Sequence, residues 1–137
     1  MKTEKIAEEL NQIQIEQARQ LSQLANMFSL NGETGVMLWL NQQQSDIFAI
    51  DIIEHFGLTA GRVANIVKKL EQKGYITREH NIEDLRKSHI TLTRSGIDYA
   101  NEQYSLMNEN HMSFIKSLGE EDADAALRII KLLLSQK

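Results

Sequence analysis

The feature that most constrains the fold is a change of hydrophobic period near the middle of the chain. Elsewhere apolar residues recur every three or four positions, the spacing of amphipathic helices, whereas between residues 75 and 93 apolar and polar residues alternate. In that stretch Ile90 and Leu92 point to one face and His89 and Thr91 to the other, as in a strand. Charged residues interrupt the alternation, which predicts a β-hairpin with a loop of about eight residues.

Helical patterns flank this hairpin on both sides. The chain contains no Pro, so helices must end at Gly or at polar clusters. Gly57 and Gly74 are suited to left-handed caps, and Thr59 is suited to an N-cap because its hydroxyl can accept from a free backbone amide. A stripe that includes Ile47 and Ile50 predicts the third helix. The apolar stripes predict helices over residues 6–28, 36–40, 47–56, 59–73, 97–118 and 120–133, the first of them continuous.

Length and composition indicate one domain, 1–137, mainly α with a small β-hairpin. Hydrophobic residues make up 42% of the chain and charged residues 25%, which is ordinary for a globular protein. No apolar run reaches the ~18 residues that a membrane span needs, and the N-terminus lacks the apolar stretch of a secretory signal. There is no Cys, which excludes disulfides and thiolate chemistry. A soluble, cytoplasmic protein without a cofactor is expected.

Charge is distributed unevenly along the chain. The net formal charge is −4, yet residues 59–94 contain eight basic and four acidic residues, so this segment carries +4 and the remainder −8. A basic middle between acidic ends is typical of a protein with one face that meets a polyanion. A chance fluctuation in composition is the alternative.

The two ends of the chain are both long and amphipathic. A chain of this size offers its terminal helices little core to cover, so part of their apolar faces is expected to meet a second copy. A self-contained helical bundle is the alternative. The residues expected at the dimer interface are Ile6, Leu10, Ile13, Ile130 and Leu133.

Helix, tight turn, helix and hairpin, in this order, are the elements of a winged helix-turn-helix. The turn is "FGLT", and the second helix has an apolar back and a polar front. On that front, Arg62 can pair with guanine and Asn65 with adenine, while Lys68 and Lys69 are suited to phosphates. Gly61 costs a helix ~1 kcal/mol relative to Ala, which a close approach to DNA would explain. An ordinary solvated helix face is the alternative.

The hairpin region resembles the MarR family of bacterial transcription regulators. The matching residues are Leu70-Glu71, Lys73-Gly74-Tyr75-Ile76, Arg78, Asp84-Leu85-Arg86-Lys87, Ile90, Leu92-Thr93 and Gly96. The resemblance implies a winged helix at 31–93, dimerisation helices at 1–30 and 94–137, and a homodimeric repressor bound to a palindromic operator in double-stranded DNA. Many members have Ser or Thr early in the recognition helix, where this chain reads "TAGRVAN", so the operator sequence stays open.

The resemblance also implies roles for single residues. Arg86 would reach into the minor groove from the hairpin, called the wing in this family, and Asp84 would hold the wing in shape. A narrow minor groove concentrates negative potential, which suits such an arginine. A solvated charged turn is the alternative for this segment alone. Together the expected DNA contacts are Thr59, Gly61, Arg62, Asn65, Lys68, Lys69, Arg78, Arg86 and Lys87.

A signal that releases the protein from DNA is less well defined by the sequence. A lipophilic or phenolic effector is an open possibility, and ordinary core packing is the alternative for the residues that would line its pocket, Met27, Phe28, Met37 and Trp39. The four His residues have no paired spacing, so no metal site is expected, and His111 lies on an apolar helix seam. No phosphate loop or nucleophile motif indicates an enzyme. A winged helix that contacts only proteins is the other alternative.

Overall fold

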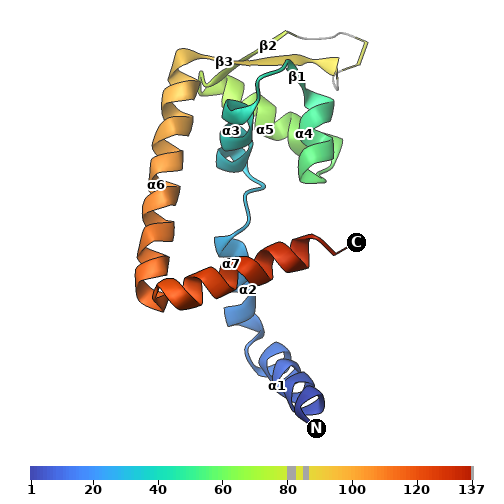
Figure 1. Cartoon of the computed structure of the whole chain (residues 1–137). Coiled ribbons are helices and arrows are strands. Elements are labelled where there is room, and N and C mark those ends of the chain that lie inside the picture. The colour runs from blue at the N-terminus through green and yellow to red at the C-terminus, as the bar shows by residue number, and fades with distance from the viewer. Residues whose placement is uncertain (80–82, 85–86, 137) are drawn as a thin grey trace. The chain divides into compact units, whose positions relative to one another are not determined.

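A three-stranded sheet and a helix-turn-helix lie side by side in the computed structural model, which describes residues 1–79, 83–84 and 87–136. The chain falls into two units, residues 1–31 and residues 32–137. Within the described residues the elements are α1 Lys2–Glu16, α2 Ala18–Met27, α3 Glu33–Gln42, β1 Ile47–Phe48, α4 Ala49–Phe56, α5 Ala60–Gln72, β2 Ile76–Glu79, β3 His89–Leu92, α6 Arg94–Leu118 and α7 Glu120–Leu134 (Figure 1).

The first unit corrects the prediction of one continuous helix over 6–28. Its backbone leaves the helical region at Gln17, where φ is −118° and ψ is 35°, and a second helix begins at Ala18. The Gln17 amide still bonds to the Ile13 carbonyl, and the Gln17 carbonyl accepts from Leu21, so both helices share this residue. All of residues 1–31 are exposed, so no buried side chains keep α1 and α2 in line as one helix.

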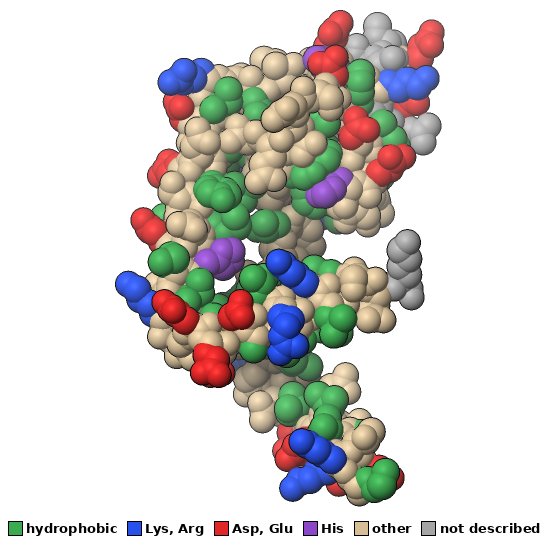
Figure 2. All heavy atoms as spheres, in the orientation of Figure 1, with side chains coloured by type: hydrophobic (Ala, Val, Ile, Leu, Met, Phe, Trp, Pro, Cys, Tyr) green, Lys and Arg blue, Asp and Glu red, His purple; other side chains and the backbone are tan. Residues whose placement is uncertain are grey.

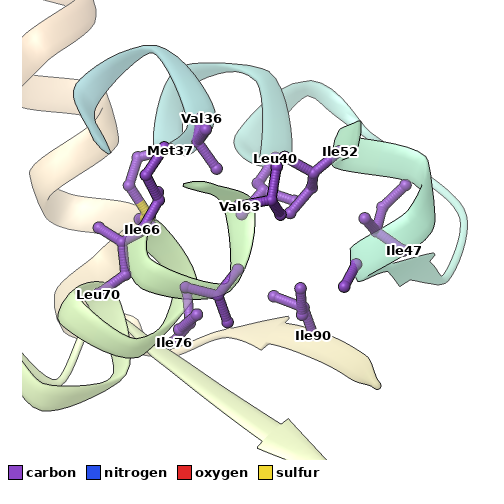
Figure 3. Packing of buried hydrophobic residues seen from close by; sticks show 12 residues of the cluster. Val36, Met37, Leu40, Ile47, Ile52, Val63, Ile66, Leu70, Ile76 and Ile90 are labelled. Atoms are coloured by element: carbon purple, nitrogen blue, oxygen red, sulfur yellow. The ribbon is translucent and has the colours of Figure 1, made fainter. Parts of the chain in front are cut away.

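The core of the second unit lies between α3, α4, α5 and the sheet. Met37 and Ile52 are fully buried here. Val36, Met37 and Leu40, from the predicted helix over 36–40, all belong to this core. Figure 3 shows these side chains converging from the helices and the sheet. The cluster consists of Val36, Met37, Leu40, Ile47, Ala49, Ile52, Val63, Ile66, Val67, Leu70, Ile76 and Ile90.

The turn between α4 and α5 forms as its residues predict. Gly57 has φ 63°, the left-handed cap that ends α4. The Thr59 hydroxyl accepts from the Arg62 amide at 3.1 Å, and this bond satisfies one of the free donors at the start of α5. Gly74 has φ 80° and lies just after α5. Three caps identified in the sequence are therefore confirmed.

The sheet has one more strand than the sequence predicts. Its order is β1-β3-β2, with both pairs antiparallel, and β2 and β3 form the expected hairpin. Ile47 belongs to β1 and pairs with Ile90, so its assignment to a helical stripe was wrong. The Asp51 carboxylate accepts from the Phe48 amide at 2.8 Å. Phe48 is thus the N-cap, and α4 begins at Ala49 and not at residue 47. Ile52, not Ile50, carries the buried face of α4.

The helix α6 is the longest element, and its first turns pack on α3. Its N-cap is Thr93, whose hydroxyl accepts from the Gly96 amide at 3.0 Å. Ala100 is fully buried, whereas Tyr104 and Leu118 further along the helix are 52% and 40% exposed. The second half of α6 and the whole of α7 therefore carry apolar side chains that their own unit leaves exposed.

Among the residues that the structure describes, no helix combines the length and apolar character that crossing a bilayer requires.

Candidate nucleic-acid interface

The helix α5 separates its residues sharply into two faces. Val63, Ile66, Val67 and Leu70 are at most 4% exposed and hold the helix on the core. The opposite face reaches solvent throughout, and it carries Gly61, Arg62, Asn65, Lys68, Lys69 and Gln72. Because the back of α5 is fixed, the face that carries its cations and side-chain amides is turned toward solvent, as a groove-reading helix requires.

Gly61 is not needed by the packing of the fold. A Cβ built on it would meet no atom within 4 Å, and its backbone is not in the left-handed region. A helix would gain from Ala at this position, by up to ~1 kcal/mol. The glycine is thus unexplained by the structure of the chain itself, whereas close contact between the start of α5 and a ligand would explain it.

Two of the basic residues near α5 form ion pairs with carboxylates of the same unit. Arg78, a predicted DNA contact, has a side chain only 13% exposed, and its guanidinium lies 3.3 Å from the Glu71 carboxylate on α5. This position favours a structural role for Arg78, in which its ion pair with Glu71 joins β2 to α5. Lys73 donates to Glu33 at 2.8 Å, and this hydrogen bond and the charge of the carboxylate raise the pKa of the Lys73 amine.

The returning strand of the wing begins on contacts that sequence reasoning missed. His89 lies 3.3 Å from Asp46, and the Ser88 carbonyl accepts from the Ala49 amide at 3.1 Å. Both contacts join the start of β3 to residues 46–49, which lead into α4. They link residues about forty positions apart, and neither partner has a local pattern that reveals the other.

The tip of the wing is described only in part. Lys87 is exposed, and its amide donates to the Asp84 carbonyl at 3.0 Å, which brings these two predicted wing residues together. Arg86, the predicted minor-groove arginine, lies outside the described residues.

The residues predicted for an effector pocket are split between the two units. Met27 and Phe28 belong to the first unit and are 62% and 48% exposed. In the second, Met37 is fully buried in the core, and Trp39 stacks on His55 with ring centroids 4.4 Å apart. The pocket stays a prediction. No group of three or more His, Cys, Asp or Glu able to hold a metal occurs in the described part of the chain.

The predicted dimer residues are all at the surface. Ile6, Leu10 and Ile13 are 49%, 56% and 40% exposed, and Ile130 and Leu133 are 39% and 65% exposed. Figure 2 shows hydrophobic side chains reaching the surface of α7 and the lower part of α6. Contiguous exposed apolar area is typical of interaction surfaces, and the dimer interface stays a prediction.

A helix-turn-helix with an exposed cationic second helix and an adjacent wing defines the chain as a winged helix-turn-helix protein. Residues 30–88 match the model of the MarR family. This match agrees with the resemblance of the hairpin residues to that family. The similarity to transcription regulators also agrees with the prediction that the chain is not an enzyme.

Individual relatives agree with this assignment. The HTH-type transcriptional regulator SarZ of Staphylococcus haemolyticus is 37% identical over 65 residues, which are 47% of this chain and 44% of SarZ. The chain thus matches less than half the length of this curated relative. The crystal structure of MepR, a transcription regulator of the Staphylococcus aureus multidrug efflux pump MepA, is 26% identical, covers 92% of this chain and 93% of its own, and has a TM-score of 0.59. The S. aureus MepR–DNA complex is 27% identical over 95% of this chain and 97% of its own, with a TM-score of 0.60.

Proposed function

We propose that the chain is a transcription regulator that binds double-stranded DNA in a sequence-specific manner. The observation that carries the proposal is the exposed polar face of α5, opposite a back that is almost completely buried. Arg62 and Asn65 contact base edges in the major groove, and Lys68 and Lys69 contact phosphates. Arg86 and Lys87 contact the adjacent minor groove or its phosphates from the wing. The MepR–DNA complex supports this proposal by similarity.

The regulator acts as a homodimer on a palindromic operator. The exposed apolar residues of α1 and α7 support this part of the proposal, since a second copy would cover them. Two identical recognition helices read two half-sites related by the same twofold symmetry, about one helical turn apart. Bound in a promoter, such a dimer represses transcription by occupying the DNA.

Selection from a random duplex library tests the proposal. The full chain should enrich a palindrome, and its affinity should fall with salt at a slope of roughly −0.9 per phosphate neutralised. A winged helix that contacts only proteins would enrich no sequence. Failure to enrich any duplex at low salt overturns the proposal.

Release by a lipophilic or phenolic ligand is the regulatory part of the proposal, and it is supported by the apolar residues exposed near Met27 and Phe28. Salicylate and a hydrophobic dye, titrated against the protein–DNA complex, test this part. Release at constant ionic strength supports it, and an unchanged complex at saturating ligand contradicts it.

A further inference from the structure

Three elements of the second unit meet where the recognition helix α5 ends. The segment after α5, residues 73–76, lies against the first turn of α6 and the first turn of α3. Thr93 donates through its hydroxyl to the Gly74 carbonyl at 2.6 Å and through its amide to the Tyr75 carbonyl at 3.0 Å. The Tyr75 amide in turn donates to Leu70 on α5 at 3.1 Å. The backbone thus connects α5 to α6 within a few residues.

Two tyrosines complete this junction. The rings of Tyr75 and Tyr99 stack with centroids 4.4 Å apart and an interplanar angle of 16°. The Tyr99 hydroxyl lies 2.9 Å from Thr34 Oγ1, a half-buried hydrogen bond between α6 and α3. Both rings pack against the core cluster. Tyr99 therefore touches the start of α3 through its hydroxyl and the segment after α5 through its ring.

Beyond this junction α6 runs free of the core. It has 25 residues, and its buried residues, Gly96 and Ala100, both lie in the first two turns. At 1.5 Å per residue the helix is about 37 Å long. Its far half and α7, which follow the junction along the chain (Figure 1), carry the exposed apolar surface (Figure 2). The helix α6 connects that surface with the recognition helix as a single rod.

A rod of this length converts small angles into large displacements. A tilt of about 5° at one end moves the other end by about 3 Å, close to the rise of about 3.4 Å along the DNA axis from one nucleotide of a strand to the next. The direction in which α6 leaves the winged helix is therefore critical for the separation of two recognition helices. A stacked ring alone can slide or rotate, whereas a hydrogen bond at its edge fixes its orientation.

We propose that the Tyr99–Thr34 hydrogen bond, together with the Tyr75 stack, sets the angle between α6 and the winged helix and so selects the half-site spacing of the operator. Tyr99, Thr34 and Tyr75 are positioning residues that do not touch DNA. The proposal rests on the proposed function, because half-site spacing has meaning only for a dimer on DNA.

The test uses the full chain and the palindrome selected with it, with one base pair inserted or removed at the centre. Tyr99→Phe keeps the ring and removes the hydroxyl, and Thr34→Val removes the partner hydroxyl with little change of shape. Each variant should lower the affinity penalty for the altered spacing by about three- to tenfold, the scale of one neutral hydrogen bond. The double variant should lower it no further, because both changes remove the same bond.

Tyr104→Phe is the matched control, since Tyr104 lies on the same helix and is 52% exposed. It should keep the wild-type penalty. The salt slope should be the same for all five proteins, the wild type and the four variants, because none of these residues contacts phosphate. Thermal unfolding monitored with circular dichroism shows whether each variant is folded. If the folded Tyr99→Phe and Thr34→Val variants retain the wild-type spacing penalty, the inference is overturned. A wild-type chain that binds no duplex overturns the proposed function and the inference with it.

Discussion

At the scale of single residues, the same amino acid serves different ends at two positions. Gly61 has open space around it, and a side chain there would contact nothing in the chain. Gly96 lies against the Tyr75 carbonyl and the Met37 side chain, and a Cβ there would overlap that carbonyl oxygen. The packing of the fold thus requires glycine at position 96 and not at position 61.

Gly61→Ala should therefore separate stability from binding. We expect the free energy of unfolding to stay equal or to rise by up to about 1 kcal/mol, because Ala favours the helix. Affinity for the selected duplex should fall, because the methyl group would lie where the helix backbone approaches DNA. Urea unfolding and fluorescence anisotropy measure the two effects. A variant that binds as tightly as the wild type contradicts a close approach at Gly61.

Gly96→Ala should show the opposite pattern. The new methyl group would displace the Tyr75 carbonyl, which accepts from Thr93. Overpacking of this kind costs about 1–3 kcal/mol of unfolding free energy. A thermal midpoint equal to that of the wild type would show that the segment 73–76 adjusts without cost.

At the scale of elements, the wing is fastened to the recognition helix by a charged pair. Arg78 on β2 extends its side chain along the core and places its guanidinium beside Glu71 on α5. The methylene stem of a largely buried arginine contributes packing as well as charge. The wing and α5 are thus held together from inside the fold.

Arg78→Ala should accordingly act on stability. We expect a loss of about 1–3 kcal/mol in unfolding free energy, because the change removes packing and leaves Glu71 without this partner. The salt slope of DNA binding should stay at its wild-type value, whereas Lys69→Ala, on the exposed face, should reduce the slope by about one unit. A reduced slope for Arg78→Ala would instead support the prediction that Arg78 contacts phosphate.

Elements built from local signals could be predicted from the sequence, and those that depend on distant partners could not. The caps at Gly57, Thr59 and Gly74 and the β2–β3 hairpin follow from turn chemistry and from alternation. Strand β1 has two residues and exists only because β3 pairs with it. The exposed face of α5 could be predicted because helical spacing assigns each residue a side. Arg78 pairs with Glu71 because of the way β2 packs across α5, and residue spacing alone does not predict that packing.

At the scale of the whole molecule, the chain combines a basic middle segment with exposed apolar side chains on its terminal helices. Leucine and isoleucine side chains on α1 and α7 are exposed in the single chain, and one of them, Leu133, is 65% exposed. A second copy that covers them would also supply a second recognition helix. Dimerisation and operator binding are therefore expected to fail together.

Two neighbouring isoleucines on α1 allow this expectation to be tested. Ile13 lies on the predicted stripe and is 40% exposed, whereas Ile15 lies off it and is 75% exposed. Ile13→Glu should weaken the dimer by at least about 2 kcal/mol, or roughly thirtyfold, because it brings a charge into the interface. Ile15→Glu should leave the dimer intact. Light scattering over a dilution series measures both, and equal dissociation of the two variants would contradict the predicted stripe.

The central claim is that the exposed face of α5 reads DNA sequence. The most direct test compares the wild type with Arg62→Ala. The affinity of each is measured for the selected palindrome and for a duplex with one altered base pair per half-site. The wild type should discriminate between the two duplexes, and Arg62→Ala should lose about 1–3 kcal/mol per half-site together with discrimination at one base pair. Arg128→Ala on α7 is the control for loss of a positive charge. The claim is contradicted if Arg62→Ala binds both duplexes as the wild type does.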